Sequence, residues 1–132
     1  MGAKLADPAR RVLALQGDGS LLFGVSALWS AANQGLGVAL VVADNGGYEI
    51  LRAGLEGMTG RPEGRWPGIA LSEPRIDLES VCRGFGASTA RADRPSDLRE
   101  ALADLWRRTG DGPAVLVVGV EGRSAPVGYP LR

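Results

Sequence analysis

Two short polar clusters carry the residue types that bind a hard cation beside a phosphate group. The first is residues 17–20, GDGS, and the second is residues 44–48, DNGGY. Mg²⁺ takes about six oxygen ligands and usually combines one or two protein carboxylates or amides with ligand phosphates and water. Asp18 offers the negative charge and Asn45 a neutral amide oxygen. The two clusters therefore predict a shared magnesium and phosphate site.

The elements around these clusters would bring them together. Residues 11–16 form an apolar run of strand length, and a helix is expected from about Ser20, with its free N–H groups facing phosphate. Residues 38–43 are apolar throughout, as is typical of a parallel strand covered on both faces. Because a strand-helix-strand unit crosses over right-handed, Asp18 and Asn45 should meet at one sheet edge. The residues that fall at helical spacing between the strands are Leu22, Val25, Ser26, Trp29 and Ala32.

Either cluster alone has a simpler interpretation. Gly, Asn and Asp are ordinary turn residues, so each cluster could be only a turn or loop, and it is their joint occurrence at this spacing that favours a binding site. A nucleotide-binding module of Rossmann type is a further alternative. It fits poorly, because the sequence GDGSLL lacks the third glycine of that fingerprint and no strand-end acid follows about 20 residues later.

The two clusters and the unit between them resemble the thiamin-diphosphate motif, a GDG triplet followed by an asparagine that is doubled in many members. This motif belongs to the diphosphate-binding domain of the benzoylformate decarboxylase and acetolactate synthase superfamily. The resemblance implies an α/β fold with three α/β/α layers and a mostly parallel sheet of about four or five strands. It covers residues 1–132 as a single domain of this type.

The resemblance also assigns roles to residues of both clusters. It implies that Asp18, Asn45 and the backbone carbonyl of Gly47 bind Mg²⁺, which in the family bridges to the diphosphate of the cofactor. Asp44 stands where many members have the first asparagine, and we expect it to support the loop rather than to bind metal. The implied reaction is decarboxylation of a 2-oxo acid, or transfer of the resulting acyl carbanion to another carbonyl.

Further residues are implied to contact the cofactor or the substrate. Gly19 and Ser20 would contact phosphate, and Gly17 and Tyr48 belong to the same cofactor-binding set. Leu51, in a short helix expected over residues 49–56, is a candidate contact to cofactor or substrate, although packing in the core is an equal alternative.

The remaining segments follow a regular α/β pattern. Residues 57–74 are rich in glycine and proline and should form an irregular loop. A helix over residues 76–86, with Asp77 near its start, leads to a short strand at residues 88–91. An amphipathic helix then opens at residues 93–96, and a last buried strand is expected at residues 114–118. The expected flexible tail is residues 121–132.

Composition excludes several classes of function. Fifteen basic and fifteen acidic residues cancel, so no nucleic acid or anionic membrane partner is expected, and no apolar run approaches the roughly 20 residues of a membrane helix. We therefore expect a cytoplasmic protein. The sequence has no histidine, which excludes histidine-based catalysis and histidine-ligated zinc within the chain. The single cysteine, Cys82, cannot form an internal disulfide and is expected in the core.

The resemblance also implies what other protein parts must supply. Family enzymes have a pyrimidine-binding domain, whose glutamate activates the cofactor ring, and their diphosphate domain begins several tens of residues upstream of a position such as Met1. We therefore expect a partner pyrimidine-binding domain or subunit, a homo- or hetero-oligomer and a small 2-oxo acid substrate. The alternative is a truncated cofactor-binding or interaction module without catalytic activity.

Overall fold

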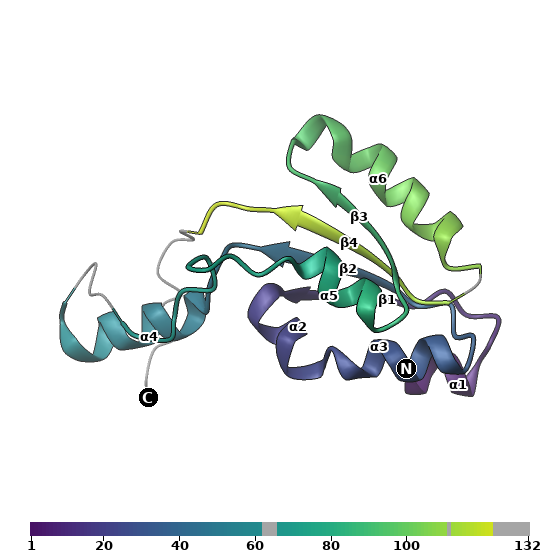
Figure 1. The fold of residues 1–132 in the computed structure, drawn as a ribbon, viewed down its shortest axis with the longest axis horizontal. Helices are drawn as coiled ribbons and strands as arrows, with labels where there is room; N and C mark the ends of the chain where they lie inside the picture. Colours follow the sequence, from purple (N-terminus) through teal and green to yellow (C-terminus); the bar gives the residue numbers. More distant parts are fainter. Residues whose placement is uncertain (62–65, 111, 123–132) are drawn as a thin grey trace.

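The structure is a computed structural model that describes residues 1–61, 66–110 and 112–122 (Figure 1). Four strands form one sheet: β1 (Leu13–Gly17), β2 (Ala39–Asp44), β3 (Ser88–Ala92) and β4 (Ala114–Gly119). The helices are α1 (Gly2–Ala6), α2 (Asp18–Gly24), α3 (Ser26–Asn33), α4 (Glu49–Thr59), α5 (Leu78–Gly84) and α6 (Pro95–Arg108). The predicted α/β class is confirmed.

The sheet is parallel throughout, with strand order β1-β2-β4-β3. The chain moves in one direction from β1 to β2 and on to β3, and then returns to β4. Right-handed crossovers require helices on opposite faces when the direction of travel reverses. Accordingly α2, α3 and α5 pack against one face and α6 packs against the other.

Each face of the sheet has its own apolar core. On the face of α2, α3 and α5, buried residues such as Leu21, Leu28 and Cys82 pack against Val42 and Val115 of the central strands. On the other face, Leu105 of α6 packs on a surface of small and aliphatic side chains, which include Ala39, Ala114 and Leu116. β2 and β4 are covered on both faces, which explains their unbroken apolar sequences.

The helix after the GDG triplet differs from the prediction. It begins at Asp18 rather than near Ser20, and Val25 separates it into α2 and α3. The buried apolar side chains of this unit are Leu21, Leu28 and Ala31, whereas Trp29, expected on the inner face, is exposed. Two adjacent apolar stripes run along this segment, so periodicity could not select between them. Packing against the sheet selects the stripe that contains Leu21 and Leu28.

The segment after Tyr48 also differs. α4 extends to Thr59, so residues 57–59 of the expected loop are helical, and the helix ends at Gly60, whose φ of 63° is the left-handed conformation that glycine adopts readily. No residue of α4 is buried, and Figure 1 shows this helix standing away from the sheet. Ile50 and Leu51 are exposed, so Leu51 does not pack in the core as one of its two interpretations would require. Residues 62–65 lie outside the described part of the chain.

The second half of the chain follows the prediction closely. Asp77 caps α5, because its Oδ1 accepts a hydrogen bond of 2.9 Å from the backbone N–H of Ser80. β3, α6 and β4 appear in the expected order, and residues 123–132 of the expected tail lie outside the described residues. None of the helices in the described ranges is long and apolar enough to cross a bilayer.

Cys82 lies fully inside the core, and burial raises the pKa of its thiol to about 11. Since the thiolate is the reactive form, little of it is present at pH 8 while Cys82 is buried. We expect native protein to react with a maleimide at pH 8 much more slowly than protein unfolded in urea, which should be labelled at one site. Labelling at equal rates in the two states would contradict the buried position; mass spectrometry measures the outcome.

Candidate cofactor-binding site

Asp18 and Asn45 meet at the carboxyl edge of the sheet, as the crossover argument predicts. β1 and β2 are neighbours, and Gly17 at the end of β1 is in register with Ala43 near the end of β2. Asp18 follows Gly17 directly, and Asn45 follows the last residue of β2. In open parallel sheets, ligands bind outside this edge of the strands.

Backbone N–H groups hold the Asp18 carboxylate. Its Oδ1 accepts a hydrogen bond from the N–H of Gly19 at 2.8 Å, and its Oδ2 accepts from those of Gly46 at 2.9 Å and Gly47 at 3.1 Å. A carboxylate has about four acceptor positions, so three bonds leave one for a further ligand. Asp18 thereby joins the start of α2 to the loop after β2.

Asp18 has no cationic side chain beside it in the described part of the chain, although it is only 2% exposed. The other buried acid, Asp44, provides the contrast: it is 7% exposed and forms ion pairs with Arg75 at 2.6 Å and Arg91 at 3.0 Å. Buried charges in proteins are normally paired with an opposite charge or coordinate a metal. The surroundings of Asp18 therefore fit a bound cation.

Two further oxygens lie in the same loop. The amide oxygen Oδ1 of Asn45 accepts a hydrogen bond of 3.1 Å from the N–H of Gly47. The carbonyls of Gly46 and Tyr48 accept hydrogen bonds from Leu71 and Arg52, but that of Gly47, a buried residue, accepts none from the described residues. A carboxylate, an amide oxygen and a free carbonyl are donors of the kind that Mg²⁺ prefers.

A metal site built from acids alone is absent from the described residues, because no three Asp, Glu, Cys or His side chains gather there. A cation at this edge would need a mixed set of oxygens, and Asp18, Asn45 and Gly47 offer one. The residues present fit the magnesium ion that the motif implies.

The remaining expected contact residues surround this loop. The ring of Tyr48 lies over Gly19: a Cβ added to Gly19 would be 2.5 Å from two ring carbons. Gly17 is half-buried, and Ser20 is exposed on the first turn of α2. Leu51 is 53% exposed, so the alternative of core packing does not hold within the described chain. Its contact with a cofactor or substrate stays a prediction.

Residues 69–71, which lie in the irregular loop expected over residues 57–74, support the loop after β2 from the other side. The N–H of Tyr48 donates to the carbonyl of Ile69 at 2.9 Å, and the N–H of Leu71 donates to the carbonyl of Gly46 at 2.8 Å. The sequence patterns did not indicate Arg75 and Arg91 as partners of Asp44. A buried acid at the end of a strand is itself a signal that an arginine should be near. Partial burial lowers the pKa of Arg91, but hydrogen bonds to Asp93 and Asp44 raise that pKa above its ordinary value, so its charge is secure.

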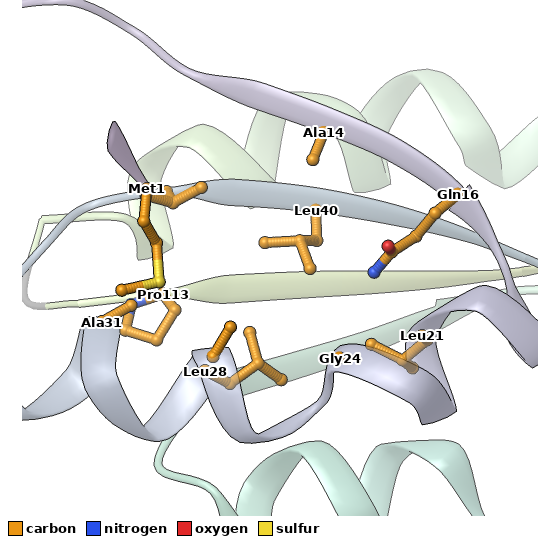
Figure 2. A pocket seen from close by; sticks show the side chains of 11 residues that line it. Met1, Ala14, Gln16, Leu21, Gly24, Leu28, Ala31, Leu40 and Pro113 are labelled. Carbon is orange, nitrogen blue, oxygen red and sulfur yellow. The ribbon is translucent and has the colours of Figure 1, made fainter. Parts of the chain in front are cut away.

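A cavity of about 230 Å³ lies elsewhere, between the sheet and the pair α2 and α3 (Figure 2). Its walls are apolar apart from Gln16, and they include Ala14 and Leu40 from the strands and Leu21 and Leu28 from the helices. Asp18 and Asn45 are not among its lining residues. The cavity is lined partly by exposed residues, such as Met1 and Gly24, and is separate from the polar site.

Comparisons with known proteins agree with this geometry. The chain is 36% identical over 102 residues to benzoylformate decarboxylase of Pseudomonas aeruginosa, which covers 77% of the chain and 18% of that protein. It is 27% identical over 133 residues to acetolactate synthase isozyme 1 large subunit of Escherichia coli, with 99% of the chain and 22% of that protein covered. The chain thus spans about a fifth of the length of these relatives.

A solved structure shares the fold. The thiamine diphosphate-dependent 4-hydroxybenzoylformate decarboxylase of Rhodococcus jostii RHA1 superposes with a TM-score of 0.79 at 31% identity, covering 94% of this chain and 22% of that one. The sequence profile described as "Thiamine pyrophosphate enzyme, C-terminal TPP binding domain" matches residues 1–118. The chain belongs to this family of thiamine pyrophosphate (thiamin diphosphate) enzymes.

Proposed function

We propose that this chain binds thiamin diphosphate through Mg²⁺, as the diphosphate-binding part of a lyase that acts on 2-oxo acids. One observation carries the proposal: the buried Asp18 carboxylate has no cationic partner among the described residues and lies at hydrogen-bonding distance from the loop of Asn45 and Gly47. A cation bound there would supply the missing positive charge.

The protein's own residues would divide the work. Asp18, Asn45 and the carbonyl of Gly47 would hold the metal, and Gly19 and Ser20 would hold the diphosphate. The bound cofactor would supply a thiazolium ylid as the nucleophile and its thiazolium ring as the electron sink for decarboxylation. The aromatic ring of Tyr48 over Gly19, together with Gly17, would limit access of water to the metal.

The substrate class is supported by the names of the relatives, which include a decarboxylase and an acetolactate synthase. Both activities fit a small 2-oxo acid that is decarboxylated or joined to a second carbonyl compound. Leu51 on α4, exposed and directly after the loop, is the proposed apolar contact to the substrate or cofactor.

Activity is proposed to require a pyrimidine-binding domain from a partner. Support comes from the share of the relatives that this chain spans, about a fifth, and from the exposed apolar side chains of α4. In the absence of histidine, the chain offers no imidazole for proton transfer. We place the protein in the cytoplasm as an oligomer, without a nucleic acid or membrane partner.

The first prediction from this proposed function concerns the charge of Asp18. The variant Asp18→Asn keeps the side chain's size but loses its charge, and we expect thiamin diphosphate to bind about 10- to 100-fold more weakly in the presence of Mg²⁺. Isothermal titration calorimetry measures the affinity with Mg²⁺ and with EDTA. The same exchange at Asp104 on α6, where the acid pairs with Arg108, is the matched control and should leave binding unchanged.

Two results would count against the metal site. Wild-type binding that is equally tight in EDTA would exclude a required cation, and equal binding by Asp18→Asn would exclude Asp18 as its ligand. If wild-type protein binds no cofactor even with Mg²⁺, the chain is better explained as the inactive module that the sequence left open as an alternative.

The second prediction concerns the close approach of Tyr48 to Gly19. The variant Gly19→Ala places a Cβ where the Tyr48 ring lies, so the ring must move and the loop with it. We expect weaker Mg²⁺-dependent binding with little change in the melting temperature, since the ring lies at the edge of the fold. Gly84→Ala adds a Cβ in open space at the end of α5 and is the control. Unchanged affinity in Gly19→Ala would remove Gly19 from the site.

The third prediction concerns association. Ile50 and Met58 of α4 are exposed apolar residues on a helix without buried side chains. We expect wild-type protein to self-associate with rising concentration in analytical ultracentrifugation, and the double variant Ile50→Ser/Met58→Ser to do so less. Trp29→Ser, which changes an exposed side chain of α3, should have no such effect. Equal self-association of the wild-type protein and the double variant would contradict the role of α4 as the contact surface.

A further inference from the structure

Asp44 lies directly before the loop of residues 45–48, which is called the metal loop here because it carries Asn45 and Gly47. It is the last residue of β2, directly before Asn45, and it is a second buried carboxylate near Asp18. Three guanidinium N–H groups, from Arg75 and Arg91, donate to its Oδ2 at 2.6 to 3.0 Å. Its charge is therefore compensated, whereas Asp18 has no cationic partner among the residues that the structure describes.

The contact from Arg91 crosses a strand. Arg91 belongs to β3, and β4 lies between β3 and β2. On β4 the residue in register with Asp44 is Gly119. A Cβ on Gly119 would lie 2.6 Å from Oδ1 of Asp93 and 3.6 Å from Nη2 of Arg91. The missing side chain of Gly119 thus leaves the space for the Arg91 and Asp93 pair over β4.

The contact from Arg75 closes the segment that supports the loop. Residues 69–71 bind the backbone of Gly46 and Tyr48, as described above, and Arg75 follows at the end of the same segment. The side chain of Arg75 is 58% exposed and that of Arg91 is 26% exposed. Solvent screens an exposed pair more strongly, so Arg91 should contribute more to holding Asp44.

We propose that Arg91, with Arg75, positions the metal loop through Asp44. Because two arginines bind its carboxylate, Asp44 is unavailable to a cation. The same contacts fix the direction in which the chain leaves β2 toward Asn45. The N–H groups of Gly46 and Gly47 then face Asp18, and the oxygens of Asn45 and Gly47 stay open for the metal. The role of Arg91 in holding the loop rests on the contacts described above. Its consequence for cofactor binding rests on the proposed function.

The test measures the loop without any ligand. In Arg91→Gln, we expect the amides of Gly46 and Gly47 to exchange with solvent about tenfold faster than in the wild type, by NMR, because their hydrogen bonds to Asp18 open more often. The amides of Leu40 and Val42 inside β2 should keep their rates. Arg75→Gln should give a smaller change, and Arg91→Lys, which keeps the charge, should lie nearer to the wild type.

Two further variants separate positioning from a general loss of stability. Arg83→Gln removes an arginine of α5 that bonds Ser80 and Thr89 and does not contact Asp44, and it should leave the Gly46 and Gly47 rates unchanged. Gly119→Ala keeps both charges but fills the space over β4, and it should loosen the loop as Arg91→Gln does. Unchanged exchange at Gly46 and Gly47 in Arg91→Gln, or equal acceleration throughout β2, would overturn the inference.

Cofactor titration then links the two proposals. If wild-type protein binds thiamin diphosphate with Mg²⁺, Arg91→Gln should bind it about tenfold more weakly, and equal affinity would overturn the role of Arg91 in positioning the metal loop. If the wild type does not bind the cofactor, the proposed function fails, while the exchange rates still decide whether Arg91 holds the loop.

Discussion

The site depends on one interaction, the burial of the Asp18 carboxylate against three backbone N–H groups. Two of these N–H groups belong to the glycine pair after β2, so a side chain from one strand end fixes the loop of the next. A buried carboxylate is costly without hydrogen bonds, and these bonds offset much of that cost. They also orient the loop so that the carbonyl of Gly47 is left without a donor among the described residues.

The two buried acids at this sheet edge show how the fold separates structural charge from charge available to a ligand. Asp44 ends β2, Asp18 directly follows the last residue of the neighbouring β1, and both are buried. Asp44 is neutralised by arginines that come from β3 and from the segment before α5. Within the described part of the chain, Asp18 is bonded only to backbone N–H groups, which carry partial positive charge and cannot cancel a full negative one. A cation is therefore expected at only one of the two positions.

The peripheral elements are consistent with a domain that functions in contact with other protein parts. α4 follows directly from the polar loop and carries apolar side chains that the described chain does not cover. The central strands β2 and β4 are, in contrast, fully enclosed between the two helical layers. The enclosed sheet therefore holds the polar loop at its edge, and α4, a helix without buried residues, follows that loop.

The sequence by itself determined the α/β class, the order of strands and helices in the second half, and the meeting of Asp18 with Asn45. These follow from short-range patterns: apolar runs mark buried strands, glycine and asparagine mark the turns, and a right-handed crossover places two strand ends side by side. The Asp77 cap is of the same kind, because its partner Ser80 is three residues away.

Only the tertiary structure decided which side of α2 and α3 faces the sheet, how far α4 runs, and which charges hold Asp44. Leu21 and Leu22 both begin apolar stripes, and the packing against β2 selects between them. Gly57 and Gly60 both permit a helix end, and the structure ends the helix at Gly60. Arg91 reaches Asp44 across a strand and from 47 positions away in sequence, and no local pattern encodes such a contact. Local sequence sets conformational preferences, whereas long-range pairing depends on where the folded sheet places each side chain.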